Sequence, residues 1–146
     1  MSFVGGYRGA GRTYEVHMIW FAALLFAVPA PLVAAVEHAE SRGVWSVKSP
    51  AGCVGLMQIC PRWSPVRPRW LLWLPPVNRI EGARQLAHWH RRAHGDWSRA
   101  IAAYRCGNRG LRGKCGRVYA RLVLGKALAI CPSCANSGIM TSLDGR

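Results

Sequence analysis

Acidic residues are scarce in this chain of 146 residues: six Asp and Glu stand against 20 Lys and Arg, which gives a formal net charge of +14 at pH 7. The electric field of so much positive charge favours polyanionic partners, which include anionic cell-wall polymers, membrane surfaces and nucleic acid. Charge alone does not distinguish among them. The shortage also argues against the paired carboxylates that most hydrolytic glycosidases use. Glu15 and Asp144 lie near the termini, and Asp96 is placed to cap a helix. If Glu40 is one catalytic acid, Glu81 is the candidate left for the second, and its surroundings suggest a structural role.

The chain also lacks the ligand spacings of a metal site and the residues of a nucleophilic triad. A structural zinc site needs four closed ligands, whereas Cys131-x-x-Cys134 has no matching second pair. The five histidines form no metal-type helix pair, and no Ser-His-Asp arrangement is recognisable. We therefore expect no metal and no cofactor. A specific nucleic-acid partner is not expected either, because that interpretation rests on charge alone.

No apolar run is long enough to cross a membrane without interruption. The run from Met18 to Val36 is broken by Pro29 and Pro31, whereas a span needs about 20 consecutive apolar residues. Two interpretations follow. Residues 18–30 are a secretory signal or membrane anchor, or residues 21–28 form the first helix of the domain. The second interpretation, a first domain helix, is favoured. Contact with a membrane through residues 18–36 stays open as a further alternative.

Cysteine, in contrast, is plentiful, with six in the chain. This number in a small protein suggests an oxidising compartment, such as the periplasm or an extracellular particle. Sequence alone cannot fix the pairing, but Cys106 with Cys115 would close a loop between two helices. Pairs of Cys53 with Cys60 and of Cys131 with Cys134 would complete a local set. Free buried thiols in a reducing cytosol are the alternative.

Glu40 occupies an unusual position for a carboxylate. On the helix predicted after the two prolines, Leu32, Val36 and Glu40 lie one turn apart on the apolar face. Burial there raises a carboxyl pKa. Gly43 is expected to end the helix, so Glu40 lies near the negative end of the helix dipole, which disfavours a second negative charge. Both effects keep a proton on the acid near neutral pH, as a general acid requires. The alternative is a charge at the edge of an exposed stripe. Glu37, further round the helix, is expected to face solvent.

Four short motifs follow one another: Glu40-Ser41, Gly55-Leu56-Met57-Gln58, Asn78-x-x-x-Gly82 and Ala103-Tyr104-x-x-Gly107. Their order and spacing resemble the catalytic core of the soluble lytic transglycosylase family, which has the goose-type lysozyme fold and cleaves peptidoglycan glycan strands. Two positions depart from the family pattern. Arg105 stands where the usual residue is Asn, and Cys60 stands where many relatives have Met.

The resemblance implies an α+β, mainly α, lysozyme-like single domain over residues 18–128. Composition predicts a flexible extension for residues 1–17, which are rich in Gly and Arg, and a loose tail for residues 129–146. It implies that Glu40 is the general acid and base on the β-1,4 bond between N-acetylmuramic acid and N-acetylglucosamine. The substrate's own N-acetyl group would steady the oxocarbenium-like centre, and the product would carry a 1,6-anhydro end. The residues implied to bind substrate are Ser49, Gly55, Met57, Gln58, Tyr104 and Tyr119.

The rest of the chain is expected to form the scaffold. Asn78 opens one helix, Asp96 caps the next, and a final helix follows around residues 118–123. The tryptophans between residues 62 and 76 could stack on sugar rings, but filling the core beneath a loop is the favoured interpretation. These tryptophans are Trp63, Trp70 and Trp73.

Peptidoglycan glycan strands are the expected partner, in the cell envelope or periplasm or on a virion. The resemblance also suggests service in a secretion, conjugation or phage particle assembly. Two alternatives remain. One is a hydrolytic lysozyme that uses the same acid with water. The other is a non-catalytic, basic binding protein of an envelope or virion.

Overall fold

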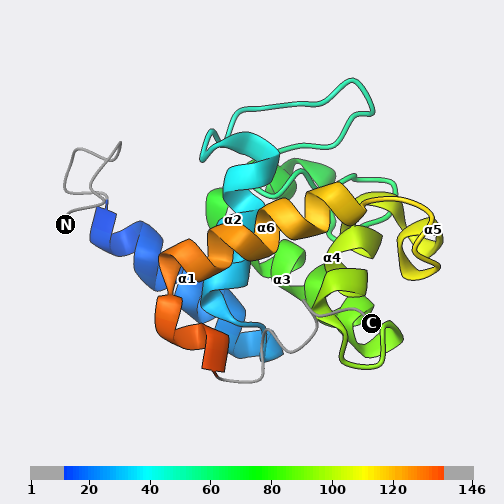
Figure 1. Ribbon diagram of the computed structural model, residues 1–146. Coiled ribbons are helices and arrows are strands. Elements are labelled where there is room, and N and C mark those ends of the chain that lie inside the picture. The colour runs from blue at the N-terminus through cyan, green and yellow to red at the C-terminus, as the bar shows by residue number, and fades with distance from the viewer. Residues whose placement is uncertain (1–11, 137–146) are drawn as a thin grey trace.

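The computed structural model describes residues 12–136, which fold into six α-helices and two short 3₁₀-helices (Figure 1). The β component of these residues is limited to two isolated bridges, Lys48–Val54 and Val54–Ile59. The expected mainly helical architecture is confirmed. The helices are α1 (Arg12–Phe26), α2 (Ala30–Ser41), η1 (Arg69–Trp73), α3 (Pro75–Arg92), α4 (Trp97–Cys106), α5 (Asn108–Leu111), α6 (Arg117–Ile130) and η2 (Pro132–Asn136).

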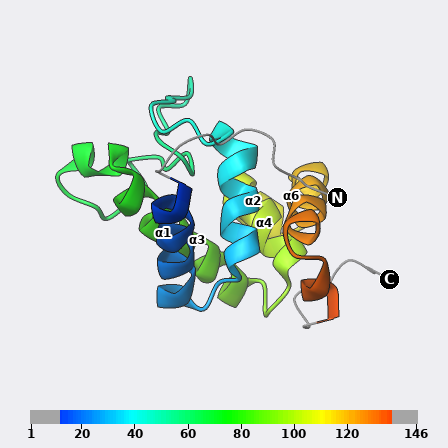
Figure 2. The same ribbon diagram turned by 90° about the vertical axis from the view of Figure 1, so that its left-hand side faces the viewer.

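Helix α2 is the centre of the bundle. Figure 2 shows it between α1 and α3 on one side and α4 and α6 on the other. Proline in the first turn suits a helix start, because its missing N–H has no partner there in any case. The helix ends in Arg42, which adopts the left-handed conformation with φ 56° and donates its N–H to His38 O. The stop therefore comes one residue before Gly43, and Glu40 lies in the last turn as predicted.

Helix α1 begins earlier than the sequence suggests. It starts at Arg12, so residues 12–17, which were expected to belong to a flexible extension, are helical; residues 1–11 lie outside the described part. Its inner face is closely packed, with Ala22 and Ala23 buried. Its outer face is apolar and exposed; the large side chains on it are Val16, Trp20, Phe21, Leu24 and Leu25.

Within residues 12–136, no single helix has the length and apolar character needed to cross a membrane. Helices α1 and α2 meet those criteria only as a pair bent by 117° at the break between them.

At the other end of the chain, η2 continues the helical structure into the expected tail, and residues 137–146 of that tail lie outside the described part.

Glu37 is buried, so the expectation that it faces solvent is wrong. It is 5% exposed and forms a two-pronged ion pair with Arg79 of α3, at 2.8 Å to Nε and 2.9 Å to Nη2. The reason is that α2 is covered on several sides, so its buried surface is wider than the single stripe that the apolar residues outline. A buried carboxylate is stable in such a place only with a charged partner.

Several scaffold predictions are confirmed. Asp96 caps α4 by accepting the N–H of Arg99 at 3.0 Å, and Trp97 and Ile101 pack into the core from that helix. The three local disulfides all form: Cys53–Cys60, Cys106–Cys115 and Cys131–Cys134. The core-filling interpretation of the tryptophans is wrong for Trp63 and Trp70, which are 73% and 61% exposed.

Candidate active site

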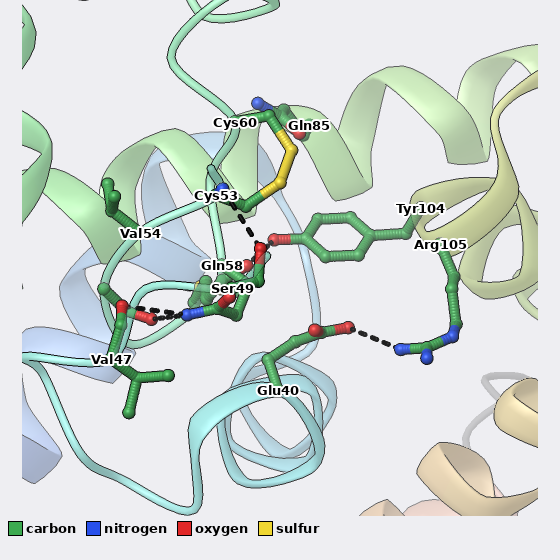
Figure 3. Close-up of a disulfide and its surroundings, with 12 residues drawn as sticks. Glu40, Val47, Ser49, Cys53, Val54, Gln58, Cys60, Gln85, Tyr104 and Arg105 are labelled. Atoms are coloured by element: carbon green, nitrogen blue, oxygen red, sulfur yellow. Dashed lines mark hydrogen bonds and ion pairs between the residues drawn. A yellow bond between two sulfur atoms is a disulfide. The ribbon is translucent and has the colours of Figure 1, made fainter. Parts of the chain in front are cut away.

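Glu40 is largely buried but still reaches solvent, with a side chain 12% exposed. Its Oε1 accepts a hydrogen bond from the hydroxyl of Tyr119 on α6 at 2.5 Å. Arg105, at the end of α4, approaches the same oxygen with Nη1 at 3.9 Å, as Figure 3 shows. Residues from three helices, separated by up to 79 positions in the sequence, thus meet at one carboxylate.

The surroundings of Glu40 favour its protonated form. Removal from water raises the pKa of this carboxyl above its ordinary value, and the Tyr119 hydrogen bond and the Arg105 charge counteract only part of that effect. Burial and the neighbouring carboxylate also raise the pKa of Tyr119, which therefore keeps its proton and remains a donor. The result is a carboxyl that can hold a proton and can also be stabilised once the proton has left.

Gln58 lies on the segment that faces Glu40, in the left-handed conformation with φ 51°. Its Nε2 donates to Val47 O at 3.2 Å and to Gly55 O at 3.0 Å. The amide donors therefore hold the turn together. Among the described contacts, the side-chain oxygen Oε1 has no partner, so it is the group left for a ligand.

Ser49 is half-buried, and its Oγ accepts the N–H of Cys53 at 3.1 Å. The disulfide between Cys53 and Cys60 then closes the turn that carries Gln58. Figure 3 shows Ser49 and Gln58 between this bridge and Glu40. Cys60, one of the two positions that depart from the family pattern, thus braces the segment.

Two of the six residues expected to bind substrate lie behind the site. Met57 is fully buried, and Gly55 is buried as well. A Cβ on Gly55 would lie 2.3 Å from the amide nitrogen of Asn78, so the close approach requires glycine. The structure therefore gives these two residues a place in the support of the site.

The Asn78-x-x-x-Gly82 motif has a clear physical role in this support. Asn78 is fully buried; its Oδ1 accepts the N–H of Met57 at 2.7 Å, and its Nδ2 donates to Val54 O and Leu72 O at 2.9 and 2.7 Å. One turn later, Gly82 leaves room for the Met57 side chain, whose sulfur would lie 2.2 Å from any Cβ there. Helix α3 thus holds the turn from behind.

Tyr104 of α4 fixes the same turn from the other side. Its hydroxyl donates to the backbone oxygen of Met57 at 2.7 Å, and desolvation raises its pKa well above the ordinary value. Figure 3 shows its ring above Glu40 and next to Ser49 and Gln58. The structure therefore gathers four of the predicted residues around Glu40. They are Ser49, Gln58, Tyr104 and Tyr119.

The sequence did not predict the contact between Arg105 and Glu40. The available signal was the arginine itself, which replaces asparagine directly after Tyr104. Among the described residues, no group of three or more His, Cys, Asp or Glu side chains could hold a metal ion. A cavity of about 260 Å³ between α1, α2 and α6 is lined by Glu37 and His38, but not by Glu40 or the four residues around it.

Comparison with known proteins gives two findings. The family model of the transglycosylase SLT domain matches residues 17–122. A solved structure of an inactive mutant of the lytic transglycosylase Slt from Pseudomonas aeruginosa superposes with a TM-score of 0.71 at 21% sequence identity. The match covers 85% of this chain and 24% of that one, so this chain spans about a quarter of the length of Slt. No curated protein matches the chain.

Proposed function

Because this chain belongs to the transglycosylase SLT domain family, we propose that it cleaves the glycan strands of peptidoglycan with Glu40 as general acid and base. The observation that carries the proposal is the environment of this carboxyl. Desolvation raises its pKa, Tyr119 donates a hydrogen bond to it, and it still reaches solvent. The matched Slt structure is of an inactive glutamate-to-glutamine mutant, which is consistent with a glutamate as the essential acid.

The remaining carboxylates with described side chains are all engaged elsewhere. Glu37 is paired with Arg79, Glu81 with Arg84 and Gln85, and Asp96 caps α4. Glu15 lies 3.9 Å from Arg79. Glu81 is near enough to help raise the pKa of Tyr104, but its carboxylate is held by Arg84 and Gln85. Since each of these acids already has a partner, we infer a mechanism with one carboxylate.

In that mechanism, Glu40 gives its proton to the glycosidic oxygen as the C1–O bond of N-acetylmuramic acid breaks. The acetamido group of the same sugar stabilises the positive charge that develops at C1. The 6-hydroxyl of that sugar then attacks C1 and gives its proton to the ionised Glu40, which restores the acid. The products are a free N-acetylglucosamine 4-hydroxyl and a 1,6-anhydro end, with no water consumed.

Substrate binding is assigned to the groups that the site leaves available. The Oε1 atom of Gln58 would accept the N–H of an acetamido group, while Ser49 and the ring of Tyr104 border the same space. Tyr119 would hold Glu40 in position through the proton transfers. The competing proposal is a lysozyme, in which water takes the place of the 6-hydroxyl.

The test is the clearing of purified peptidoglycan by wild type and by Glu40→Gln, followed by mass analysis of the products. We expect wild type to release anhydro-muropeptides and Glu40→Gln to be slower by about a thousandfold, within the usual range for general acid catalysis. Reducing ends would instead identify a lysozyme. Lysis that survives Glu40→Gln would overturn the assignment of the acid. A wild type without lysis would favour the non-catalytic binding protein.

We also propose that the chain is exported and works in the cell envelope or on a virion, because its three disulfides need an oxidising compartment. Service in a secretion, conjugation or phage assembly is part of this proposal. So is membrane contact within residues 18–36. The apolar outer face of α1 supports it for residues 18–26, whereas Leu32, Val33 and Val36 of α2 are buried in the core. Co-sedimentation with anionic vesicles, compared between wild type and Leu24→Gln, tests the membrane contact.

A further inference from the structure

Arg105 stands beside the proposed acid on a fixed piece of backbone. It follows Tyr104, whose hydroxyl is bonded to Met57, and precedes Cys106, which forms a disulfide with Cys115. Its guanidinium lies 3.9 Å from the Oε1 of Glu40 and over the ring of Tyr119, 5.0 Å from the ring centre. Yet 54% of the side chain is exposed, so a ligand can reach it.

The arginines of this chain that serve the scaffold look different. Arg79 and Arg84 each place two nitrogens on a carboxylate at 2.7–2.9 Å, in the forked geometry that uses their donors well. Arg105 approaches Glu40 at 3.9 Å, beyond hydrogen-bond distance. Within the described part of the chain, its contacts are Glu40 and the face of Tyr119, so its fork of N–H donors is open to a planar anion.

The substrate offers a suitable anion close to the bond that breaks. N-acetylmuramic acid carries a lactyl ether at C3 of the sugar whose C1 is attacked. This group ends in a carboxylate when the stem peptide has been removed, and in an amide when the peptide is attached. Since Glu40 must contact the glycosidic oxygen of that sugar, a guanidinium 3.9 Å from Glu40 lies within one sugar residue of the lactyl group.

We propose that Arg105 forms a carboxylate-binding subsite that recognises the free lactyl group of muramic acid, so that the chain prefers glycan strands stripped of their peptides. This inference rests on the proposed function of the site. A lactyl carboxylate would take the guanidinium in the two-pronged geometry that Glu40 does not provide. It would also neutralise the positive charge of Arg105, which otherwise favours loss of the proton from Glu40. Binding of a peptide-free strand would therefore keep the acid ready to donate.

The test uses two matched substrates, a peptide-free glycan oligomer and the same oligomer with its lactyl carboxylates converted to methylamides. We expect kcat/KM of wild type to be about tenfold higher on the carboxylate form, and the ratio to fall to about one in Arg105→Gln. Arg105→Lys keeps the charge without the fork and should give an intermediate ratio. Arg121→Gln, which removes an exposed charge from α6, is the matched control and should leave the ratio unchanged.

A binding arm separates this proposal from the catalytic one. In the Glu40→Gln background, titration followed by NMR should show tighter binding of the carboxylate oligomer, and adding Arg105→Gln should remove the difference. If the chain binds with this preference but never cleaves, the proposed function fails and the subsite remains. If it cleaves both oligomers equally well, or if Arg105→Gln keeps the preference, the subsite is overturned. Absence of both binding and cleavage overturns both.

Discussion

Helix α2 carries two carboxylates one turn apart, and their surroundings differ. Glu37 faces α3 and is fully matched by the guanidinium of Arg79. Glu40 faces α4 and α6, where a phenol donates to it and an arginine stays at 3.9 Å. The first arrangement fixes the negative charge and joins two helices. The second leaves a carboxyl whose proton can leave and return, which is the property that acid catalysis needs.

The comparison shows that burial alone would not single out the proposed acid. Glu37 is the more deeply buried of the two, yet its charge is already compensated. What distinguishes Glu40 is incomplete compensation next to solvent. If this view is correct, changes on the Glu37 side should mainly alter stability. Changes on the Glu40 side should mainly alter the chemistry and the way in which stability depends on pH.

The largest effect is expected for Arg79→Ala. Removing the guanidinium leaves Glu37 buried without its partner, which should lower the free energy of unfolding by about 3–5 kcal/mol. Urea denaturation followed by circular dichroism measures this loss. Arg121→Ala, at an exposed site on α6, should change stability by less than about 0.5 kcal/mol. A comparable loss in both variants would contradict the special place of the Glu37–Arg79 pair.

A smaller effect, on activity, is expected for Tyr119→Phe. The phenol orients Glu40 and lowers its pKa, so its removal should reduce kcat/KM about tenfold and raise the pKa of the acid. A higher pKa means that Glu40 stays protonated to higher pH, so the alkaline limb of the pH–rate profile should move upward. Tyr104→Phe is the control for the pH profile alone. Its hydroxyl is bonded to Met57 and not to Glu40, so the alkaline limb should stay in place. An alkaline limb that moves downward in Tyr119→Phe would disprove the assignment.

Glu40→Gln should alter the pH dependence of stability. The pKa of Glu40 is higher in the folded state than in the unfolded chain, so this carboxyl costs stability as the pH rises through that interval. Glutamine cannot ionise and escapes the cost. The melting temperature of the variant, relative to wild type, should therefore be higher at about pH 8 than at about pH 4. A difference that is the same at both pH values would show that Glu40 is not desolvated.

The smallest effect is expected for Glu15→Gln. Glu15 also approaches Arg79, at 3.9 Å, but its side chain is 41% exposed and the arginine already has Glu37. Ion pairs at such sites contribute less than about 1 kcal/mol. Denaturation of this variant beside Arg79→Ala shows whether the arginine depends on its buried partner alone. A loss as large as that of Arg79→Ala would mean that the two carboxylates share the role.

Features that depend on neighbouring residues could be predicted from the sequence. The cap at Asp96 and the three disulfides join residues that are three to nine positions apart. The position of Glu40 on an apolar face could be predicted because it follows from helical spacing alone. The motif at Asn78 and Gly82 could be recognised, but its role as a brace behind Met57 became clear only in three dimensions.

Contacts between distant helices could not be predicted in the same way. Glu37 and Arg79 are 42 positions apart, and the sequence around either residue resembles that of any solvated charge. The approach of Arg105 to Glu40 likewise depends on how α2 and α4 both pack against α6. Trp63, in the segment between α2 and η1, is 73% exposed, and composition cannot distinguish such a residue from a buried aromatic.

Two of the sulfur bridges border the candidate active site. Cys53–Cys60 closes the turn that carries Gln58, and Cys106–Cys115 begins at the residue after Arg105. The Glu37–Arg79 ion pair, which joins α2 to α3, forms without a disulfide. In a reducing environment, a newly synthesised chain would thus form the ion pair between α2 and α3 while the segments around Glu40 still lacked their disulfides. Oxidation of these two bridges would then be the last step that fixes the surroundings of Glu40.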